Sequence, residues 1–340
     1  MAELQQQPVF VIGNPRSGTT MFRLALTAHP QISIPPENPF LVKLFARFGR
    51  IRSFQQAQLD ELFQAMSKEP VSFFERWKVD VESVREVLAQ SQGSTFAEIV
   101  ARLYQAYPRI EATKTFIWGD KNTAYFQYIN ILSWLYPKAK FIHLVRDGRA
   151  VLASYQALNK RKQENESVRF PVLPSQPIVA ATRWISAVQT IEQAFSKKRK
   201  DQCVTVRYED VVCDFENEMT KVCKFLNVDY ESDMVNFHKL NEKHSLEPRE
   251  YDSWKWRTRK PITAERVDDW KKSLSDSDIA RFERIAETQL TKFGYHLLSD
   301  KLSLSFDDRI TWLKESSNLS WRKKMRHFRF LLQILAGSRK

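Results

Sequence analysis

The segment NPRSGTT, residues 14–20, has the residue types of a phosphate-binding loop. One arginine, Arg16, and three hydroxyl side chains surround a glycine. The segment follows the apolar run VFVIG, residues 9–13, and precedes the helical pattern MFRLALTAHP, residues 21–30. Backbone N–H groups in such a loop and the dipole at the helix N-terminus favour an anion. We therefore predict a phosphate cradle here, with Arg16 as its cation.

The spacing between Gly13 and Gly18 is that of a nucleotide-binding P-loop, but the lysine of that loop is missing. Thr19 and Thr20 follow Gly18, so a kinase or ATPase acting on a γ-phosphate would lack its usual cation. A P-loop nucleotide kinase is therefore a disfavoured alternative. The blandest alternative is an ordinary strand-to-helix turn with a stray arginine.

A second group of polar residues follows the apolar run KFIHLV as RDGRAVLAS, residues 146–154. Arg146 can donate two hydrogen bonds to a phosphate, and the Ser154 hydroxyl can donate one. Two turns of helix return Ser154 to the strand-end side. Alone, Arg146 and Asp147 would be interpreted as a salt-bridged turn; together with the first loop they indicate a second phosphate site.

These two motifs resemble those of the sulfotransferases that use 3′-phosphoadenylyl sulfate (PAPS). The resemblance covers most of residues 8–295 and is strongest to tyrosylprotein sulfotransferases and their bacterial relatives, in the run PRSGTTMFRLALTAHPQISIPPENPF. It implies that Arg146 and Ser154 hold the 3′-phosphate and that Arg16 contacts the bond being broken. The residues that it assigns to the 5′-phosphate are Arg16, Ser17, Gly18, Thr19 and Thr20.

The same resemblance implies two further catalytic residues. Glu37 matches the general base of the family, and an acceptor hydroxyl must lose its proton as it attacks sulfur. Lys121, in WGDKN after the next strand, matches a lysine that neutralises charge on the transferred group. Without the resemblance, Glu37 would be interpreted as a solvated loop glutamate and Lys121 as a surface lysine.

Three weaker matches extend the expected nucleotide site. Tyr208 resembles a strand-end tyrosine that meets the nucleotide, and Lys260 resembles part of a loop that closes over the 3′-phosphate. Ser245 is included in that loop. Core packing or a plain basic loop is the alternative for each.

Apolar and amphipathic stretches alternate along the chain and predict an α/β fold, with a P-loop-like central parallel sheet flanked by helices as in sulfotransferases. We expect a sulfotransferase domain over residues 1–300, a helical insertion over about 38–107, surface loops over 159–176 and 241–265, and a basic amphipathic tail over 301–340. The predicted strands are Val9–Gly13, Phe116–Gly119, Phe141–Val145 and Val204–Tyr208. The predicted helices are roughly 18–28, 80–106, 123–135, 148–158, 177–197, 214–226 and 276–293.

The composition favours an anionic partner in a reducing compartment. The net charge is +13 over 340 residues, and 43% of the residues are hydrophobic, which excludes disorder. The three cysteines form no CxxC pair, so no metal site is predicted. The N-terminus lacks a signal-peptide pattern and no apolar run could span a bilayer, so we expect a cytoplasmic protein that binds no nucleic acid.

The tail carries an apolar stripe at helical spacing among basic residues and no acidic residue after Glu315. One interpretation is a peripheral contact with membrane lipid, and the favoured alternative is packing on the domain or on a second subunit. The oligomeric state stays open. The stripe consists of Trp321, Met325, Phe328, Leu332 and Leu335.

The residues together predict a PAPS-dependent sulfotransferase that needs no metal and modifies a hydroxyl of a glycan, lipid, small molecule or peptide tyrosine. The alternative from another class is a non-catalytic protein that binds phosphate or an anionic membrane. The chain departs from the eukaryotic tyrosylprotein enzymes because it shows no membrane anchor, and no cysteine stands near Gly119 or Glu37. A peptide-tyrosine acceptor is therefore one candidate among several.

Overall fold

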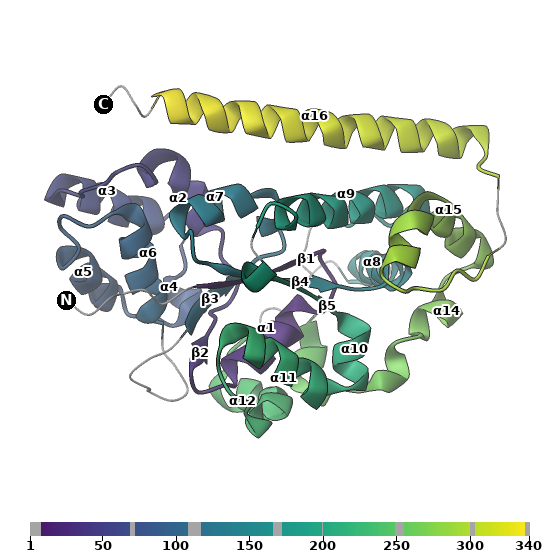
Figure 1. The fold of residues 1–340 in the computed structure, drawn as a ribbon, viewed down its shortest axis with the longest axis horizontal. Helices are drawn as coiled ribbons and strands as arrows, with labels where there is room; N and C mark the ends of the chain where they lie inside the picture. The colour runs from purple at the N-terminus through teal and green to yellow at the C-terminus, as the bar shows by residue number, and fades with distance from the viewer. Residues whose placement is uncertain are drawn as a thin grey trace.

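A five-stranded, all-parallel sheet forms the centre of the computed structural model (Figure 1). The strand order is β2-β3-β1-β4-β5, and Val9 of β1 lies opposite Gly119 and Lys140 of its two neighbours. The strands are β1 (Val9–Gly13), β2 (Ile32–Ser33), β3 (Ile117–Lys121), β4 (Lys140–Val145) and β5 (Cys203–Arg207). The structure describes residues 8–68, 72–107, 117–165, 172–198, 200–248, 255–299 and 303–336, with side chains up to Met325 in the last segment.

Side chains on β1 alternate between two hydrophobic clusters because successive residues of a strand face opposite sides of the sheet. Val9 and Val11 pack in the cluster that holds α1, α11 and α12, whereas Phe10 and Ile12 pack on the opposite face with α7 and α9. Figure 1 shows these helices as a layer on each face. Their bounds are α1 Thr19–Thr27, α7 Ile129–Leu135, α9 Pro177–Phe195, α11 Phe215–Leu226 and α12 Phe237–His244.

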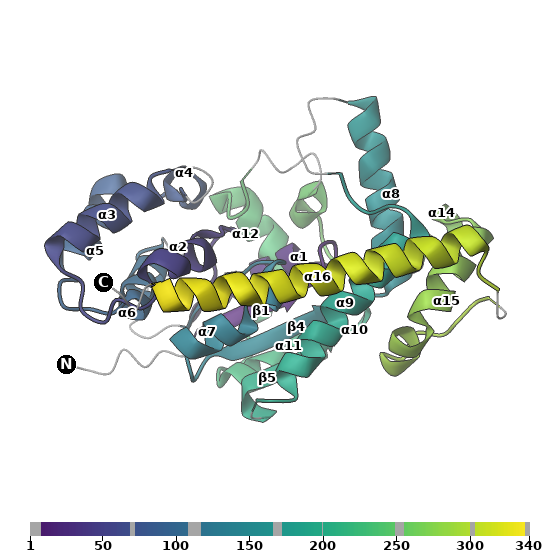
Figure 2. The same ribbon diagram turned by 90° about the horizontal axis from the view of Figure 1, so that it is seen from above.

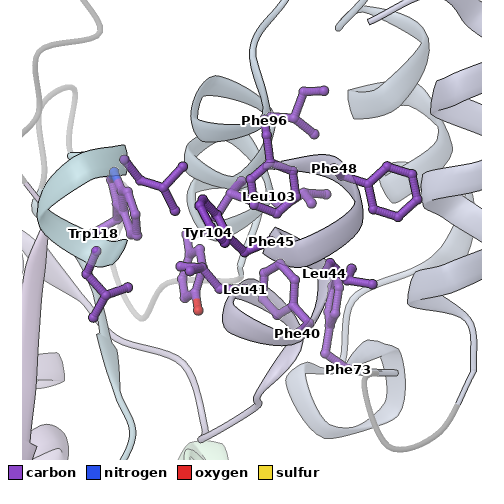
Figure 3. Close-up of a cluster of buried hydrophobic side chains, with 14 of the residues drawn as sticks. Phe40, Leu41, Leu44, Phe45, Phe48, Phe73, Phe96, Leu103, Tyr104 and Trp118 are labelled. Atoms are coloured by element: carbon purple, nitrogen blue, oxygen red, sulfur yellow. The ribbon is translucent and has the colours of Figure 1, made fainter. Parts of the chain in front are cut away.

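Helices within residues 40–105 form a group beside the end of the sheet that holds β2 and β3, and they share its core. Figure 3 shows how aromatic and leucine side chains from this group reach Trp118 of β3. The Tyr104 ring stacks on that of Trp118 with centroids 4.8 Å apart, which joins the group to the sheet. The helices are α2 Phe40–Phe48, α3 Gln56–Met66, α4 Phe74–Trp77, α5 Val81–Ala89 and α6 Phe96–Gln105.

A third cluster lies beyond the β4 end and joins α8, α9 and α15 through Trp184, Trp270 and Phe282. The long helix α16 (Phe306–Ala336) contacts α9 and α2 and runs across the molecule over α9 (Figures 1 and 2). In the part of the chain that is described, no helix is both long and apolar enough to cross a bilayer. The remaining helices are α8 Gly148–Glu164, α10 Tyr208–Cys213, α14 Asp269–Ser273 and α15 Asp276–Lys292, with short 3-10 turns at 125–127, 200–202, 232–236, 256–259 and 264–266.

The predicted fold class is confirmed, and several predicted boundaries are wrong for local reasons. The stretch 80–106 forms two helices, because Asp80 and Thr95 each cap a separate N-terminus. The predicted loop over 159–176 begins later, since α8 continues to Glu164. Tyr208 starts α10 instead of ending β5, and the two-residue β2 is too short for a periodic signal. Phe116 lies outside the described residues.

Phe10 connects three parts of the core, and its removal tests the fold. Its buried ring lies near Trp118, Tyr125 and Phe141, with centroids 5.5 to 6.2 Å away. Phe10→Ala should lower the free energy of unfolding by about 3–5 kcal/mol, because the helical group cannot collapse into the cavity. Phe306→Ala is the control, since that side chain is 77% exposed. Equal urea midpoints for the two variants would contradict this account of the core.

Candidate active site

The carboxyl ends of β1, β3, β4 and β5 lie at one edge of the sheet, where ligands of open α/β folds bind. The segments that follow these ends carry most of the predicted site residues. The loop after β1 contains Arg16, and β3 itself ends on Lys121. Arg146 follows β4, and Tyr208 follows β5.

The loop between β1 and α1 is closed by its own backbone. The Ser17 N–H donates to the Asn14 carbonyl over 3.2 Å, and Arg16 and Gly18 have φ values of 70° and 84°. Left-handed residues in such a loop turn successive N–H groups inward and form a concave anion site. Two constraints require a glycine at position 18. An added Cβ would lie 2.4 Å from the Tyr208 ring, and the left-handed φ is unfavourable for residues with a side chain.

The structure brings the two phosphate motifs together. Arg16 Nε donates to Ser154 Oγ over 3.0 Å, and Arg146 Nη1 donates to the Arg16 carbonyl over 2.9 Å. The Arg146 guanidinium also lies over the Tyr208 ring, 4.5 Å from its centroid. Its backbone is held from the opposite side, since Trp184 Nε1 donates to the Arg146 carbonyl over 3.1 Å. Residues separated by about 130 positions therefore share one pocket wall.

This pocket has a volume of about 660 Å³ and is strongly basic. Burial and the neighbouring Arg146 guanidinium lower the pKa of Arg16 to about 10, so it stays charged at neutral pH. Asp269 is the only carboxylate among the lining residues of this pocket that the structure describes. The cations in the lining are Arg16, Arg146, Arg161, Lys255, Arg257, Lys260, Arg266 and Lys272. Such an excess of positive charge favours a polyanionic ligand.

Glu37 and Lys121 form an ion pair at the same edge of the sheet. Lys121 Nζ lies 2.5 Å from Glu37 Oε2; the lysine is buried and the glutamate side chain is 30% exposed. Burial opposes ionisation of Glu37, but the ammonium groups of Lys121 and Lys255 outweigh it and hold the pKa of the carboxyl below its ordinary value. Glu37 is thus an ionised carboxylate at neutral pH and can accept a proton.

The helical group beside the sheet holds the Glu37 backbone in place. Trp77 Nε1 of α4 donates to the Pro36 carbonyl over 2.8 Å, and Arg76 Nη1 donates to the Glu37 carbonyl over 3.1 Å. The Asn38 side chain accepts from the Phe40 N–H at the start of α2. The backbone around Glu37 is therefore positioned by a helix that follows it by about forty residues.

A buried carboxylate anchors β3 next to Lys121. Asp120 accepts hydrogen bonds from the Tyr104 and Tyr125 hydroxyls, the latter over 2.5 Å. Burial raises its pKa to about 6, although both phenols oppose this shift. Because Lys121 directs its side chain to the other face of the strand, these bonds fix the strand from which it projects.

Two of the weaker sequence matches separate in the structure. Lys260 lines the pocket together with Tyr208 and the two threonines of the loop. Ser245 does not line it; this residue ends α12 with a φ of 49°. Among the described residues, no three His, Cys, Asp or Glu side chains gather in a way that could hold a metal ion.

A buried charge network was missed by sequence reasoning. Arg23, fully buried on α1, donates to Glu247 over 2.6 Å and to the Ile34 carbonyl over 2.9 Å. Glu247 also pairs with Lys255, which lines the pocket. Arg23 and Glu247 are 224 positions apart, and no local pattern links them.

Arg161 and Arg257 also line the pocket, and features of the sequence could have identified both as candidates. Arg161 follows Ser154 by seven positions and thus lies on the same face of α8. Arg257 belongs to the Trp- and Arg-rich stretch near 241–265.

Comparison with known proteins gives a consistent result. A sequence model described as Sulfotransferase family matches residues 8–232. The chain is 25% identical over 289 residues to the protein-tyrosine sulfotransferase of Drosophila melanogaster, which covers 84% of this chain and 51% of that protein. It is 23% identical over 290 residues to protein-tyrosine sulfotransferase 1 of Danio rerio, covering 84% of this chain and 72% of that one. The chain thus spans about half the length of the Drosophila relative.

Two solved structures share the fold. The sulfotransferase domain from the curacin biosynthetic pathway matches with a TM-score of 0.59 and 20% identity, over 86% of this chain and 99% of that one. The sulfotransferase domain of the Synechococcus PCC 7002 olefin synthase matches with a TM-score of 0.58 and 21% identity, over 88% and 99%. Both likenesses confirm the predicted architecture.

The buried network should be a large contributor to stability. Lys255 and Arg23 overcome burial and lower the pKa of Glu247 to about 2, below the ordinary carboxyl value of about 4.3. The stabilisation by the ionised carboxyl is therefore complete above about pH 4.3 and is lost as the pH falls toward 2. At pH 7, Glu247→Gln should lower the free energy of unfolding by about 3–5 kcal/mol, since it leaves Arg23 buried without its counter-charge.

Urea unfolding at several pH values tests this expectation. The difference between wild type and Glu247→Gln should shrink as the pH falls below about 4.3. Glu61→Gln serves as the control, because its pair with Arg47 is exposed and should contribute at most about 1 kcal/mol. A Glu247→Gln variant as stable as this control would show that the network is not stabilising.

Proposed function

The chain belongs to the sulfotransferase family, and we propose that it transfers a sulfonate group from PAPS to a hydroxyl of an acceptor. The observation that carries this proposal is the placement of a half-buried pair of cations and a carboxylate–lysine pair at one sheet edge. Arg16 and Arg146 share a pocket with Ser154, and Glu37 pairs with Lys121. Lys255 links the two, since it lines the pocket and its charge acts on Glu37.

The pocket and the loop between β1 and α1 together have the donor groups that a nucleotide with two separate phosphates needs. Ser17 Oγ and Arg146 Nε are buried and have no hydrogen-bond partner among the described residues. Ser17 would serve the 5′-phosphate with the backbone of the loop, and Arg146 with Ser154 would serve the 3′-phosphate. Trp256, Phe237 and Ile262 supply apolar wall for a nucleoside.

The reaction requires one proton transfer and one exchange of bonds at sulfur. Glu37 accepts the proton of the acceptor hydroxyl while the acceptor oxygen bonds to sulfur. The bond from sulfur to the 5′-phosphate oxygen breaks, and adenosine 3′,5′-bisphosphate leaves with the electron pair. Arg16 offsets the charge that develops on the leaving oxygen, and Lys121 offsets the charge on the sulfonate.

The alternatives explain fewer of these features. A kinase that acts on a γ-phosphate needs a cation after the second glycine of the loop, and Thr19 stands there. A protein that only binds phosphate or lipid needs no carboxylate that is kept ionised beside a buried lysine at this edge of the sheet. The acceptor classes to compare are glycans, lipids, small metabolites and peptide tyrosines; two relatives are named as acting on the last.

Nucleotide binding tests the proposed donor. Adenosine 3′,5′-bisphosphate should bind far more tightly than ATP or AMP in calorimetry, because only it fills both phosphate sites. Arg146→Ala should weaken that binding by about 1.5–3 kcal/mol, the range of a charge-assisted hydrogen bond. Arg85→Ala, at an exposed arginine on α5, should leave the affinity unchanged. ATP binding as tight as that of the bisphosphate would refute the donor assignment.

Turnover with PAPS tests the proposed base. Glu37→Gln should lower kcat by roughly 100-fold or more with the bisphosphate affinity nearly intact, whereas Glu75→Gln on neighbouring α4 should not. Because the neighbours of Glu37 lower its pKa, protonation of this carboxyl should reduce kcat/KM only below about pH 4.3. Full turnover in Glu37→Gln would exclude Glu37 as the base.

A further inference from the structure

Helix α16 rests on the domain through polar contacts. Glu315 pairs with Arg183 of α9 over 2.6 Å, and Asp308 pairs with Arg281 of α15 over 3.4 Å. Lys323 Nζ donates to Gln193 over 3.4 Å. None of the side chains described between 303 and 325 is buried. The helix therefore keeps its apolar residues out of the core, unlike the helices that cover the sheet.

The outer face of α16 instead presents large apolar side chains. Phe306 is 77% exposed, Leu313 is 53% exposed and Trp321 is 61% exposed. At roughly 100° per residue these three positions share one face, turned away from Asp308 and Glu315, which hold the opposite face on the domain. We name Phe306, Leu313 and Trp321 the outer face of α16.

Basic side chains flank this outer face. Arg309, Lys314 and Lys324 are exposed and fall on the same side of the helix by the same periodicity. Arg322 is exposed next to Trp321. Acidic residues lie only near the start of the helix, and none follows Glu315.

Charge decides between a second copy of the chain and an anionic surface. Beside the outer face the helix carries three cations, Arg309, Lys314 and Lys324, and one carboxylate, Asp307. Two copies placed face to face would therefore bring an excess of positive charge together, and like charges repel. Tryptophan, phenylalanine and leucine among lysines match the boundary between lipid headgroups and acyl chains. The total charge of +13 adds a long-range attraction of the same sign.

We propose that the outer face of α16 binds the surface of an anionic lipid bilayer, with the helix lying in the plane of the headgroups. In this arrangement Phe306, Leu313 and Trp321 enter the interface, and Arg309, Lys314 and Lys324 meet lipid phosphates. The catalytic domain stays on the side of α9. The inference does not depend on the sulfotransferase activity, since no residue of the pocket takes part.

Vesicle co-sedimentation of the full chain tests the proposal. The protein should pellet with phosphatidylcholine vesicles that contain about 30 mol% phosphatidylserine at about 50 mM salt, and it should be released at about 500 mM salt. It should stay in solution with pure phosphatidylcholine. Leu313→Ser with Trp321→Ser, and separately Lys314→Glu with Lys324→Glu, should each reduce binding by about tenfold or more.

Matched variants separate this surface from general effects. Lys224→Glu with Lys239→Glu changes the net charge equally but on α11 and α12, across the sheet from α16 (Figure 1). Val172→Ser with Val235→Ser removes two other exposed apolar side chains. Both control pairs should bind vesicles as the wild type does, and all variants should keep its melting temperature and its affinity for adenosine 3′,5′-bisphosphate.

Three results would overturn the proposal. The first is failure of the full chain to sediment with anionic vesicles at low salt. The second is an equal loss of binding in the Lys314 and Lys324 variant and in its control at Lys224 and Lys239, which would indicate an effect of net charge alone. The third is a dimer, seen by light scattering, that becomes a monomer in Leu313→Ser with Trp321→Ser while vesicles leave it unaffected. In that case a second copy covers the outer face.

Discussion

Two arginines of like charge are held together at the edge of the sheet, and the organisation of the site depends on this contact. Arg146 donates to the backbone carbonyl of Arg16, and Arg16 donates to Ser154. Neither bond neutralises a charge, so the depressed pKa of Arg16 records the repulsion and burial that remain. A polyanion bound in the pocket would place negative charge beside both guanidinium groups. The proposed binding of a nucleotide with two phosphates thus rests on the way in which the loop and α8 are packed.

The region around Glu37 is organised in the opposite way, because its charges are paired. Glu37 faces Lys121, and Glu247 lies between Arg23 and Lys255. Alternating charges keep both carboxylates ionised despite burial. In the proposed role of Glu37 as the base, these cations keep its carboxylate free of a proton. Because Lys255 also lines the pocket, the pocket wall and Glu37 share one electrostatic environment.

The helical group over residues 40–105 connects the hydrophobic core to the ion pair between Glu37 and Lys121. Its aromatic core reaches the sheet through Tyr104 and Trp118, and the same Tyr104 donates to Asp120 beside Lys121. From its outer side, Trp77 and Arg76 hold the backbone around Glu37. The two members of the ion pair are therefore positioned by one body, from a strand and from a loop. Rigid support of this kind is what a proton transfer over hydrogen-bond distance demands.

Local sequence determined the elements that carry phosphate chemistry. A strand, a glycine-bearing loop and a helix are set by backbone preferences within about twenty residues, so the loop over 14–20 and the strand-end Arg146 were predictable. The parallel sheet was predictable too, because the spacing of apolar residues along the sequence indicates buried strands and amphipathic helices. Boundaries such as the division of 80–106 depended on capping by Asp80 and Thr95, which compete with a continuous helical pattern.

Only the tertiary structure decided which charges meet. Arg23 finds Glu247 across 224 positions, and Trp77 finds the loop of Glu37, because packing of the helices closes these distances and periodicity does not encode them. Ser245 shows that position in the sequence alone does not place a residue at the site. It was assigned to the expected loop, yet it does not line the pocket. A buried charge is strongly destabilising without a partner, so the pairing of charges is decided in the folded core. The sequence alone sets only which charged residues are available.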